Sequence, residues 1–260
     1  MTETVLITGA SSGIGLELAK CFAADKAHLI LVARNTAAME SLAVELRRDH
    51  QIEVHIITAD LTLTESPQKI HDELKGRGLL VDVLVNNAGF GLHGGFAELP
   101  LLRQLEIIQV NVAALVALTG LFVPGMIERN RGGVLNVGSV AGFFAGPNMA
   151  VYYASKAFVQ SFSEALHEEL RGTGVSVTNL CPGPTETNFS QTARGYHTRQ
   201  KSVGKMSAAA VARIGYEDFR RDKCVSVTGW KNKLLAGIGT TVLPRSVARK
   251  LIKKYNKLKK

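Results

Sequence analysis

The chain has 260 residues, of which 46% are hydrophobic and 20% charged. This length suits one globular domain with a full hydrophobic core. Its three cysteines, Cys21, Cys181 and Cys224, form no C-x-x-C pair and no histidine stands at metal-ligand spacing, so neither disulfides nor a metal site is expected. The start of the chain leads directly into a strand, and no apolar run approaches the ~20 residues of a membrane span, so we expect a cytoplasmic protein.

The positive charge is concentrated at one end of the chain. Of a net charge of +9, residues 225–260 contribute ten Lys or Arg and no Asp or Glu. The remaining residues therefore sum to about −1. A nucleic-acid-binding body is not expected, because the charge belongs to the tail and lacks interleaved aromatic residues.

A glycine-rich turn follows the first predicted strand, Val5–Ile7. The sequence T-G-A-S-S-G-I-G occupies positions 8–15 and leads into a predicted helix that ends at about Ala24. Strand, glycine turn and helix form the context in which backbone amides meet a pyrophosphate at the positive end of a helix. A glycine turn without a ligand is the alternative. The nucleotide interpretation assigns cofactor contacts to Gly9, Ser11, Ser12, Gly13, Ile14 and Gly15.

The next predicted strand, 28–33, ends in Arg34 and Asn35. An acid at this point would bind the ribose 2′-hydroxyl of NAD, whereas an arginine can pair with the 2′-phosphate of NADP. The sequence has no acid here, so NADP is the expected cofactor. The alternative is a solvated arginine at a strand end.

Two further strands end in polar or small residues. The strand at 54–57 is followed by Asp60 and Leu61, which we expect at the adenine, although Asp60 could equally cap a helix or form a turn. The strand at 81–85 is followed by Asn87, Ala88 and Gly89, whose small size allows a cofactor to approach the backbone. Strands that alternate with helices predict an α/β fold, a parallel sheet with helices on both faces and ligands at the carboxyl ends of the strands.

Four residues of the second half are candidates for acid-base chemistry. Tyr152 and Lys156 are four residues apart, so they share one face of a helix, and the ammonium is expected to lower the pKa of the phenol. Ser139 follows an apolar strand and can reach the same carbonyl oxygen as Tyr152. Asn111 lies within a long apolar helix predicted over 101–129, where it could kink the helix and hold a water near Lys156. The alternatives are a chance pair of core residues and a satisfied buried amide.

Together these motifs resemble the short-chain dehydrogenase/reductase family over about the first 225 residues. The resemblance rests on T-G-A-S-S-G-I-G at 8–15, Asp60, N-N-A-G at 86–89, Asn111, Ser139, Y-Y-A-S-K at 152–156 and P-G-P-T-E-T at 182–187. It implies one doubly wound Rossmann domain at 1–229, with strand order 3-2-1-4-5-6-7 and its last strand at 225–228. It also implies hydride transfer between nicotinamide and a carbonyl, with Tyr152 as acid-base residue. Further implied contacts to the nicotinamide or pyrophosphate are Tyr152, Lys156, Pro182, Gly183, Thr185 and Thr187.

The sequence identifies the substrate less specifically than it identifies the cofactor. Candidate lining residues are mostly apolar, and we expect an apolar ketone, aldehyde or 3-oxoacyl compound, or the corresponding alcohol. The polar segment 188–205 stands where the family carries a mobile lid, and helix resumes from Met206 to about Arg221. An NADP-binding regulator or scaffold is the alternative function. The candidate lining residues are His93, Phe143, Phe144, Asn148 and Tyr196.

Residues 230–260 depart from the usual pattern of the family and are predicted as a basic helical extension. Pro244 can open a helix in which Val247, Leu251, Tyr255 and Leu258 share a face. Such a helix either packs on the protein itself or a neighbouring subunit, or makes a weak peripheral contact with an anionic membrane. The long apolar helix at 101–129 favours a homodimer or homotetramer.

Overall fold

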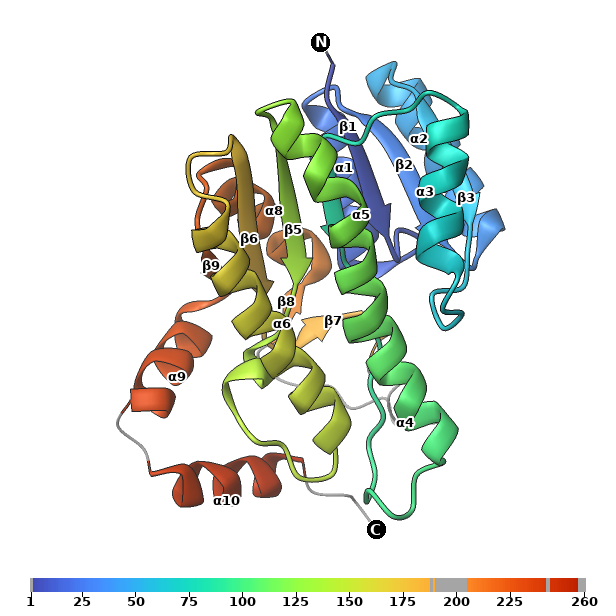
Figure 1. Ribbon diagram of the computed structural model, residues 1–260. Coiled ribbons are helices and arrows are strands. Elements are labelled where there is room, and N and C mark those ends of the chain that lie inside the picture. The colour runs from blue at the N-terminus through green and yellow to red at the C-terminus, as the bar shows by residue number, and fades with distance from the viewer. Residues whose placement is uncertain (1, 188, 190–204, 242–243, 257–260) are drawn as a thin grey trace.

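One parallel sheet of seven strands organises the chain, as the computed structural model in Figure 1 shows. The structure describes residues 2–187, 189, 205–241 and 244–256. The strand order is β3-β2-β1-β4-β5-β6-β9, which confirms the predicted doubly wound Rossmann-type α/β domain. These strands are β1 (Thr4–Thr8), β2 (His28–Ala33), β3 (Val54–Thr58), β4 (Val83–Asn86), β5 (Gly132–Val137), β6 (Val175–Cys181) and β9 (Val225–Val227).

Helices cover both faces of the sheet and form two buried apolar layers. One layer joins the sheet to α1 (Gly13–Ala24), α2 (Thr36–His50) and α8 (Ala208–Arg220). The opposite layer joins it to α3 (Ser66–Gly76), α5 (Ala114–Glu128) and α6 (Ala150–Glu169). The central strands are therefore buried on both sides, which explains their continuous apolar runs.

The predicted elements agree with the structure except in detail. The predicted helix from Met206 begins instead with a short strand, β8 (Met206–Ser207), which pairs with β7 (Thr185–Glu186) before α8 starts. Ser207 explains the later start, because its side chain accepts a hydrogen bond from Ala210 N and caps the helix.

The long helix expected over 101–129 is interrupted rather than continuous. It consists of α4 (Leu101–Ile108), a π-helical turn η1 (Gln109–Ala113) and α5. An 18-residue stretch of it has a mean hydropathy of 2.0, so by length and composition alone it could cross a membrane. The sequence-based expectation that no apolar run approaches that length is therefore wrong. Half of the apolar window is buried inside the protein, which is the position of a core helix beside a sheet.

Buried polar side chains fix α6 against the sheet. Asn86 and Asn136 are register neighbours on β4 and β5, and Asn86 Nδ2 donates to Asn136 Oδ1 at 2.9 Å. Asn136 Nδ2 donates in turn to Ser163 Oγ of α6 at 2.9 Å. On the next strand Asn179 Nδ2 donates to Gln160 Oε1 of α6 at 2.7 Å. Because buried amides require such partners, these bonds set the position of α6 and of its amino-terminal residues.

Two helices follow β9. They are α9 (Trp230–Thr241) and α10 (Arg245–Tyr255), with Pro244 at the N-cap of α10 as the sequence predicts. Figure 1 shows α10 across the amino-terminal end of α6, on the side of the molecule where the strands have their carboxyl ends.

Candidate active site

A cavity of about 1400 Å³ lies at the carboxyl ends of the strands. Sites for small ligands usually measure about 300–1,000 Å³, so there is room for more than one small molecule. Of the predicted cofactor and catalytic residues, all of which the structure describes, only Gly15 and Asn111 do not line it.

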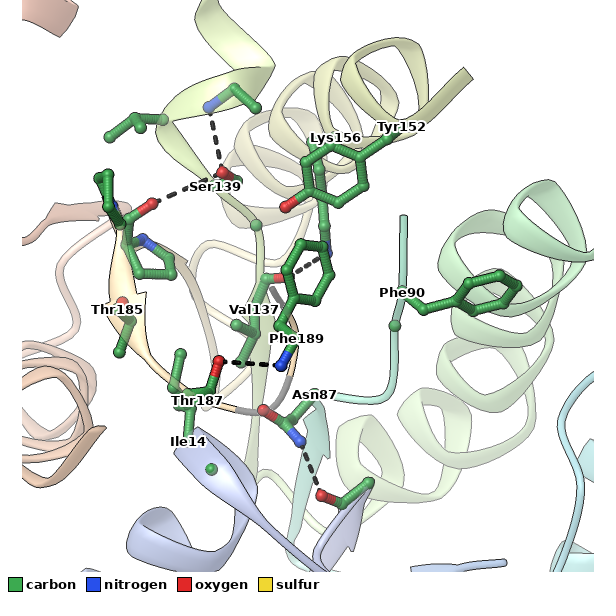
Figure 2. A pocket seen from close by; sticks show the side chains of 18 of the residues that line it. Ile14, Asn87, Phe90, Val137, Ser139, Tyr152, Lys156, Thr185, Thr187 and Phe189 are labelled. Carbon is green, nitrogen blue, oxygen red and sulfur yellow. Dashed lines mark hydrogen bonds between the residues drawn. The ribbon is translucent and has the colours of Figure 1, made fainter. Parts of the chain in front are cut away.

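The glycine turn forms one end of this cavity. Gly9 and Gly13 have φ of +66° and +59°, a conformation that glycine adopts without steric cost. Asn87 braces the turn, since its Nδ2 donates to Thr8 O at 2.8 Å and to Gly9 O at 3.1 Å. The backbone N–H groups of Asn87 and Ala88 both donate to Thr8 Oγ1 at 3.0 Å. Asn87 thus both lines the cavity and fixes the shape of the turn (Figure 2).

Gly15 does not line the cavity, and its surroundings give a packing reason for glycine at this position. A Cβ at this position would lie 2.3 Å from Asn87 Nδ2 and 2.5 Å from Gly9 O. Glycine is therefore required because α1 lies directly against the end of β4, and the contact is internal to the fold.

Polar residues lie where the second and third strands end. Arg34 is exposed and lines the cavity. Asn35 also caps α2, because its side chain accepts a hydrogen bond from Ala38 N at 3.1 Å. Asp60 forms a turn by accepting from Thr62 N at 3.0 Å. Burial opposes the ionisation of Asp60, but the bonds from Thr62 and the charge of Arg34 outweigh it and hold its pKa below the usual value.

Asn111 lies in the π-helical turn and is buried. Its Oδ1 accepts from Phe90 N at 3.0 Å, and its Nδ2 donates to Phe90 O and to Ser155 Oγ, each at 3.0 Å. The helix is therefore irregular at Asn111, as the sequence predicted. The amide of Asn111 also has hydrogen-bond partners inside the protein, which was the alternative interpretation. A Cβ at Gly89 would lie 3.0 Å from Asn111 Oδ1 and 3.5 Å from Lys156 Nζ, so both polar groups lie close to the backbone of Gly89.

Tyr152 and Ser139 meet at the centre of the cavity. Ser139 is the N-cap of the short helix η2 (Val140–Phe143), and its Oγ accepts from Ala141 N at 3.0 Å. Figure 2 shows the Tyr152 hydroxyl directed towards Ser139. Burial raises the pKa of Tyr152 to about 12, and its hydrogen bond with Ser139 acts in the opposite direction. The sequence-based expectation of a lowered pKa is therefore wrong for this structure, because the effect of burial dominates.

Lys156 is buried next to these groups. Its Nζ donates to Val137 O at 2.7 Å, so the ammonium is held at the end of β5 (Figure 2). Burial lowers the pKa of Lys156 to about 8. At neutral pH the side chain is still mostly charged.

The turn after β6 joins the two ends of the cavity. Thr185 Oγ1 donates to Gly183 O at 2.9 Å, and Thr187 lies close to Gly13, whose Cβ would be 3.1 Å from Thr187 Cγ2. A Cβ at Gly183 would lie 2.1 Å from Asn232 Nδ2 of α9. Gly183 lines the cavity, and the close contact with α9 also explains why this residue is a glycine.

The predicted substrate-lining residues have different outcomes. His93 and Phe144 line the cavity, whereas Phe143 and Asn148 do not. Asn148 instead donates from Nδ2 to Asn256 O at 2.9 Å. Tyr196 and most of the proposed lid, 188–205, lie outside the described residues.

Part of the cavity wall was missed by reasoning from the sequence. These residues lack a motif and come from loops or from the C-terminal helices, whose place beside the site depends on tertiary structure. They include Phe90, Phe189, Trp230, Leu235, Leu251, Ile252, Tyr255 and Asn256.

The residues present fit a nicotinamide dinucleotide. The positive-φ glycines and the start of α1 suit a pyrophosphate, and Arg34 offers a cation at the far end. At the other end, Lys156 supplies a buried ammonium group and Tyr152 supplies a hydroxyl group. These features belong to one continuous cavity, as the extended shape of a dinucleotide requires.

Comparison with known proteins places the chain in the short-chain dehydrogenase family. Residues 3–196 match the family model for short chain dehydrogenase. The chain is 30% identical to a very-long-chain 3-oxoacyl-CoA reductase from Rattus norvegicus, over 98% of its own length and 80% of that protein. It is 40% identical to sulfoacetaldehyde reductase 2 from Chromohalobacter salexigens, over 75% of its own length and 77% of that protein.

Solved structures resemble the fold over nearly its whole length. A short-chain dehydrogenase from Sphingobium yanoikuyae in complex with NADPH has a TM-score of 0.81 and 30% identity, covering 93% of this chain and 96% of its own. A short-chain dehydrogenase/reductase from Burkholderia phymatum in complex with NAD has a TM-score of 0.80 and 27% identity, covering 92% of each chain. Both nicotinamide dinucleotides therefore occur among similar structures.

Proposed function

Because the chain belongs to the short-chain dehydrogenase family, we propose that it is an NADPH-dependent reductase of an apolar ketone, aldehyde or 3-oxoacyl compound. Hydride-transfer oxidoreductase activity is common to the similar proteins named above. The observation that carries the proposal is the Tyr152 hydroxyl beside Ser139, in a cavity that also contains buried Lys156.

The proposed mechanism uses the chain's own groups to protonate and polarise a carbonyl. Reduced nicotinamide, when bound, supplies the hydride. Tyr152 donates the proton to the carbonyl oxygen, and Ser139 donates a hydrogen bond to the same oxygen. The Lys156 ammonium stabilises the phenolate that remains.

The protonation state of Tyr152 suits a proton donor. With a pKa raised to about 12 by burial, the phenol carries its proton at neutral pH. It can therefore act as an acid towards a carbonyl oxygen. Asn111 Oδ1 and Lys156 Nζ both lie close to the backbone of Gly89, and a water near these groups would pass a replacement proton to the site.

Arg34 supports NADP as the preferred cofactor. It is an exposed cation on the cavity wall at the end of β2, where an acid would favour the ribose hydroxyls of NAD. The next residue, Asn35, is uncharged, and its side chain caps α2. Arg34 therefore supplies the positive charge at this strand end.

The direct test is a substrate panel followed by cofactor absorbance, with NADPH and NADH in parallel. The panel contains straight-chain aldehydes and ketones of graded length, 3-oxoacyl thioesters and sulfoacetaldehyde. We expect turnover of apolar compounds with at least about tenfold higher kcat/KM for NADPH. Arg34→Ala should remove that preference with little effect on NADH.

Equal rates with both cofactors in the wild type would contradict the assignment of Arg34. Turnover of sulfoacetaldehyde alone would contradict the apolar substrate class. Lys26→Ala is the matched control, because Lys26 is an exposed cation whose Nζ binds His50 O, and it lies outside the cavity.

A further inference from the structure

Asn256, at the end of α10, joins three segments that are distant in the sequence. It is only 5% exposed. Its backbone oxygen accepts hydrogen bonds from His93 Nε2 at 3.1 Å and Asn148 Nδ2 at 2.9 Å. Its Nδ2 donates to Pro147 O at 3.1 Å and to Tyr153 Oη at 3.2 Å. One buried residue thus connects the C-terminal helix to the loops on both sides of the cavity.

The residues that bind Asn256 are themselves held in place by other contacts. Asn148 has a φ of +65°, a left-handed conformation that few side chains adopt. Its carbonyl accepts from Gly94 N at 2.9 Å, so the two loops are bonded to each other as well as to Asn256. Tyr153 makes an edge-on ring contact with Tyr152, with centroids 6.1 Å apart. The junction therefore adjoins the proposed proton donor.

The helix held by this junction contributes apolar side chains to the cavity. Leu251, Ile252 and Tyr255 of α10 line the cavity together with Phe144 and Met149 from the opposite loop. Leu251 is 55% and Tyr255 69% exposed, so the part of the chain that the structure describes leaves this apolar surface largely uncovered. An apolar ligand inside the cavity would cover it and remove it from water.

We propose that Asn256 is a positioning residue that holds α10 as the wall of the substrate compartment and thereby selects carbonyl compounds with a long apolar chain. This inference rests on the proposed reductase function. A short aldehyde needs only Tyr152 and Ser139, whereas a long chain would extend from them along Leu251, Ile252 and Tyr255.

The first test measures the position of α10 and requires no turnover. Four exposed basic residues of α10, Arg249, Lys250, Lys253 and Lys254, are potential trypsin sites. We expect Asn256→Ala to increase the rate of tryptic cleavage within 245–255 by about tenfold, because local opening exposes the helix. Mass spectrometry of the fragments measures this rate. Asn256→Asp is nearly isosteric and removes the donor to Pro147 and Tyr153, so it should have the same direction of effect.

The second test measures what the wall does for the substrate. With NADPH, we expect Asn256→Ala to raise the ratio of KM for decanal to KM for propanal by about tenfold. The same variant should weaken binding of the fluorescent long-chain probe cis-parinaric acid by a similar factor. Lys233→Ala is the control, because Lys233 is exposed on α9 and lies outside the cavity wall.

The outcomes separate the positioning role from the reductase itself. Unchanged cleavage would overturn the role of Asn256 in holding α10. Faster cleavage with an unchanged ratio of the two KM values would overturn the role of α10 in selecting long chains, as would an equal loss of kcat with both aldehydes. If the wild type reduced no aldehyde, the proposed function would fail, while cleavage and cis-parinaric acid binding would still decide the inference.

Discussion

Lys156 is the residue at which the structure changes the chemistry expected from the sequence. The Tyr-x-x-x-Lys spacing predicts which side chains meet, because residues four apart share a helix face. It does not predict their burial, which raises the pKa of Tyr152 to about 12 and lowers that of Lys156 to about 8. Burial arises from residues remote in sequence that enclose the cavity, so the motif alone carries no signal for it.

These values predict the pH dependence of carbonyl reduction. Lys156 is charged below its pKa, so its support for the phenolate is present below about pH 8 and is lost as the pH rises above it. Tyr152 remains a proton donor over the same range. We expect kcat/KM, measured with saturating NADPH, to be level below about pH 8 and to fall about tenfold per pH unit above it. A level profile up to about pH 10 would contradict the assignment to Lys156.

At the scale of elements, the contact between α1 and the end of β4 holds the glycine turn in place. The sequence predicted the strand, turn and helix, since glycine spacing and apolar periodicity are local signals. It did not predict the packing reason for glycine at 15, because a sequence does not show that Asn87 and Gly9 O occupy the space that a Cβ would need. The sequence left open whether α10 packs on the protein, on a neighbouring subunit or on a membrane, because Asn256, whose buried contacts hold it, belongs to no motif.

Gly15→Ala should therefore destabilise the fold by about 1–3 kcal/mol, because overpacking forces α1 away from the turn. Urea denaturation measures this change. Gly120→Ala is the matched control within α5, where a Cβ would meet nothing within 4 Å, and it should be neutral or stabilising by up to about 1 kcal/mol. Equal stability of the two variants would contradict a close contact of Gly15 with Asn87 and Gly9.

At the scale of the whole molecule, an exposed apolar surface lies on neighbouring helices α4 and α6. Leu102 is 75% and Phe158 42% exposed. Leu101, Leu105 and Ile108 add to this surface on α4. Exposed apolar side chains on adjoining helices often mark a subunit contact, and the long apolar helix predicted such a contact from the sequence.

We expect a homodimer or homotetramer that uses this surface. Sedimentation velocity of Phe158→Glu should show a smaller species than the wild type, because a buried charge at an interface is costly. Val44→Glu is the control, since Val44 is 60% exposed on α2, away from this surface. A wild type that sediments as a monomer would contradict the expectation.

The central claim is that the Tyr152 hydroxyl donates the proton, and Tyr152→Phe tests it most directly. The substitution keeps the ring and its burial but removes the acid. We predict a loss of kcat of about 10²–10⁴-fold for carbonyl reduction, with the NADPH dissociation constant within about twofold of the wild type. Tyr216→Phe, on α8 and outside the cavity, should keep full activity. A Tyr152→Phe enzyme that retained more than about a tenth of the wild-type kcat would contradict the account.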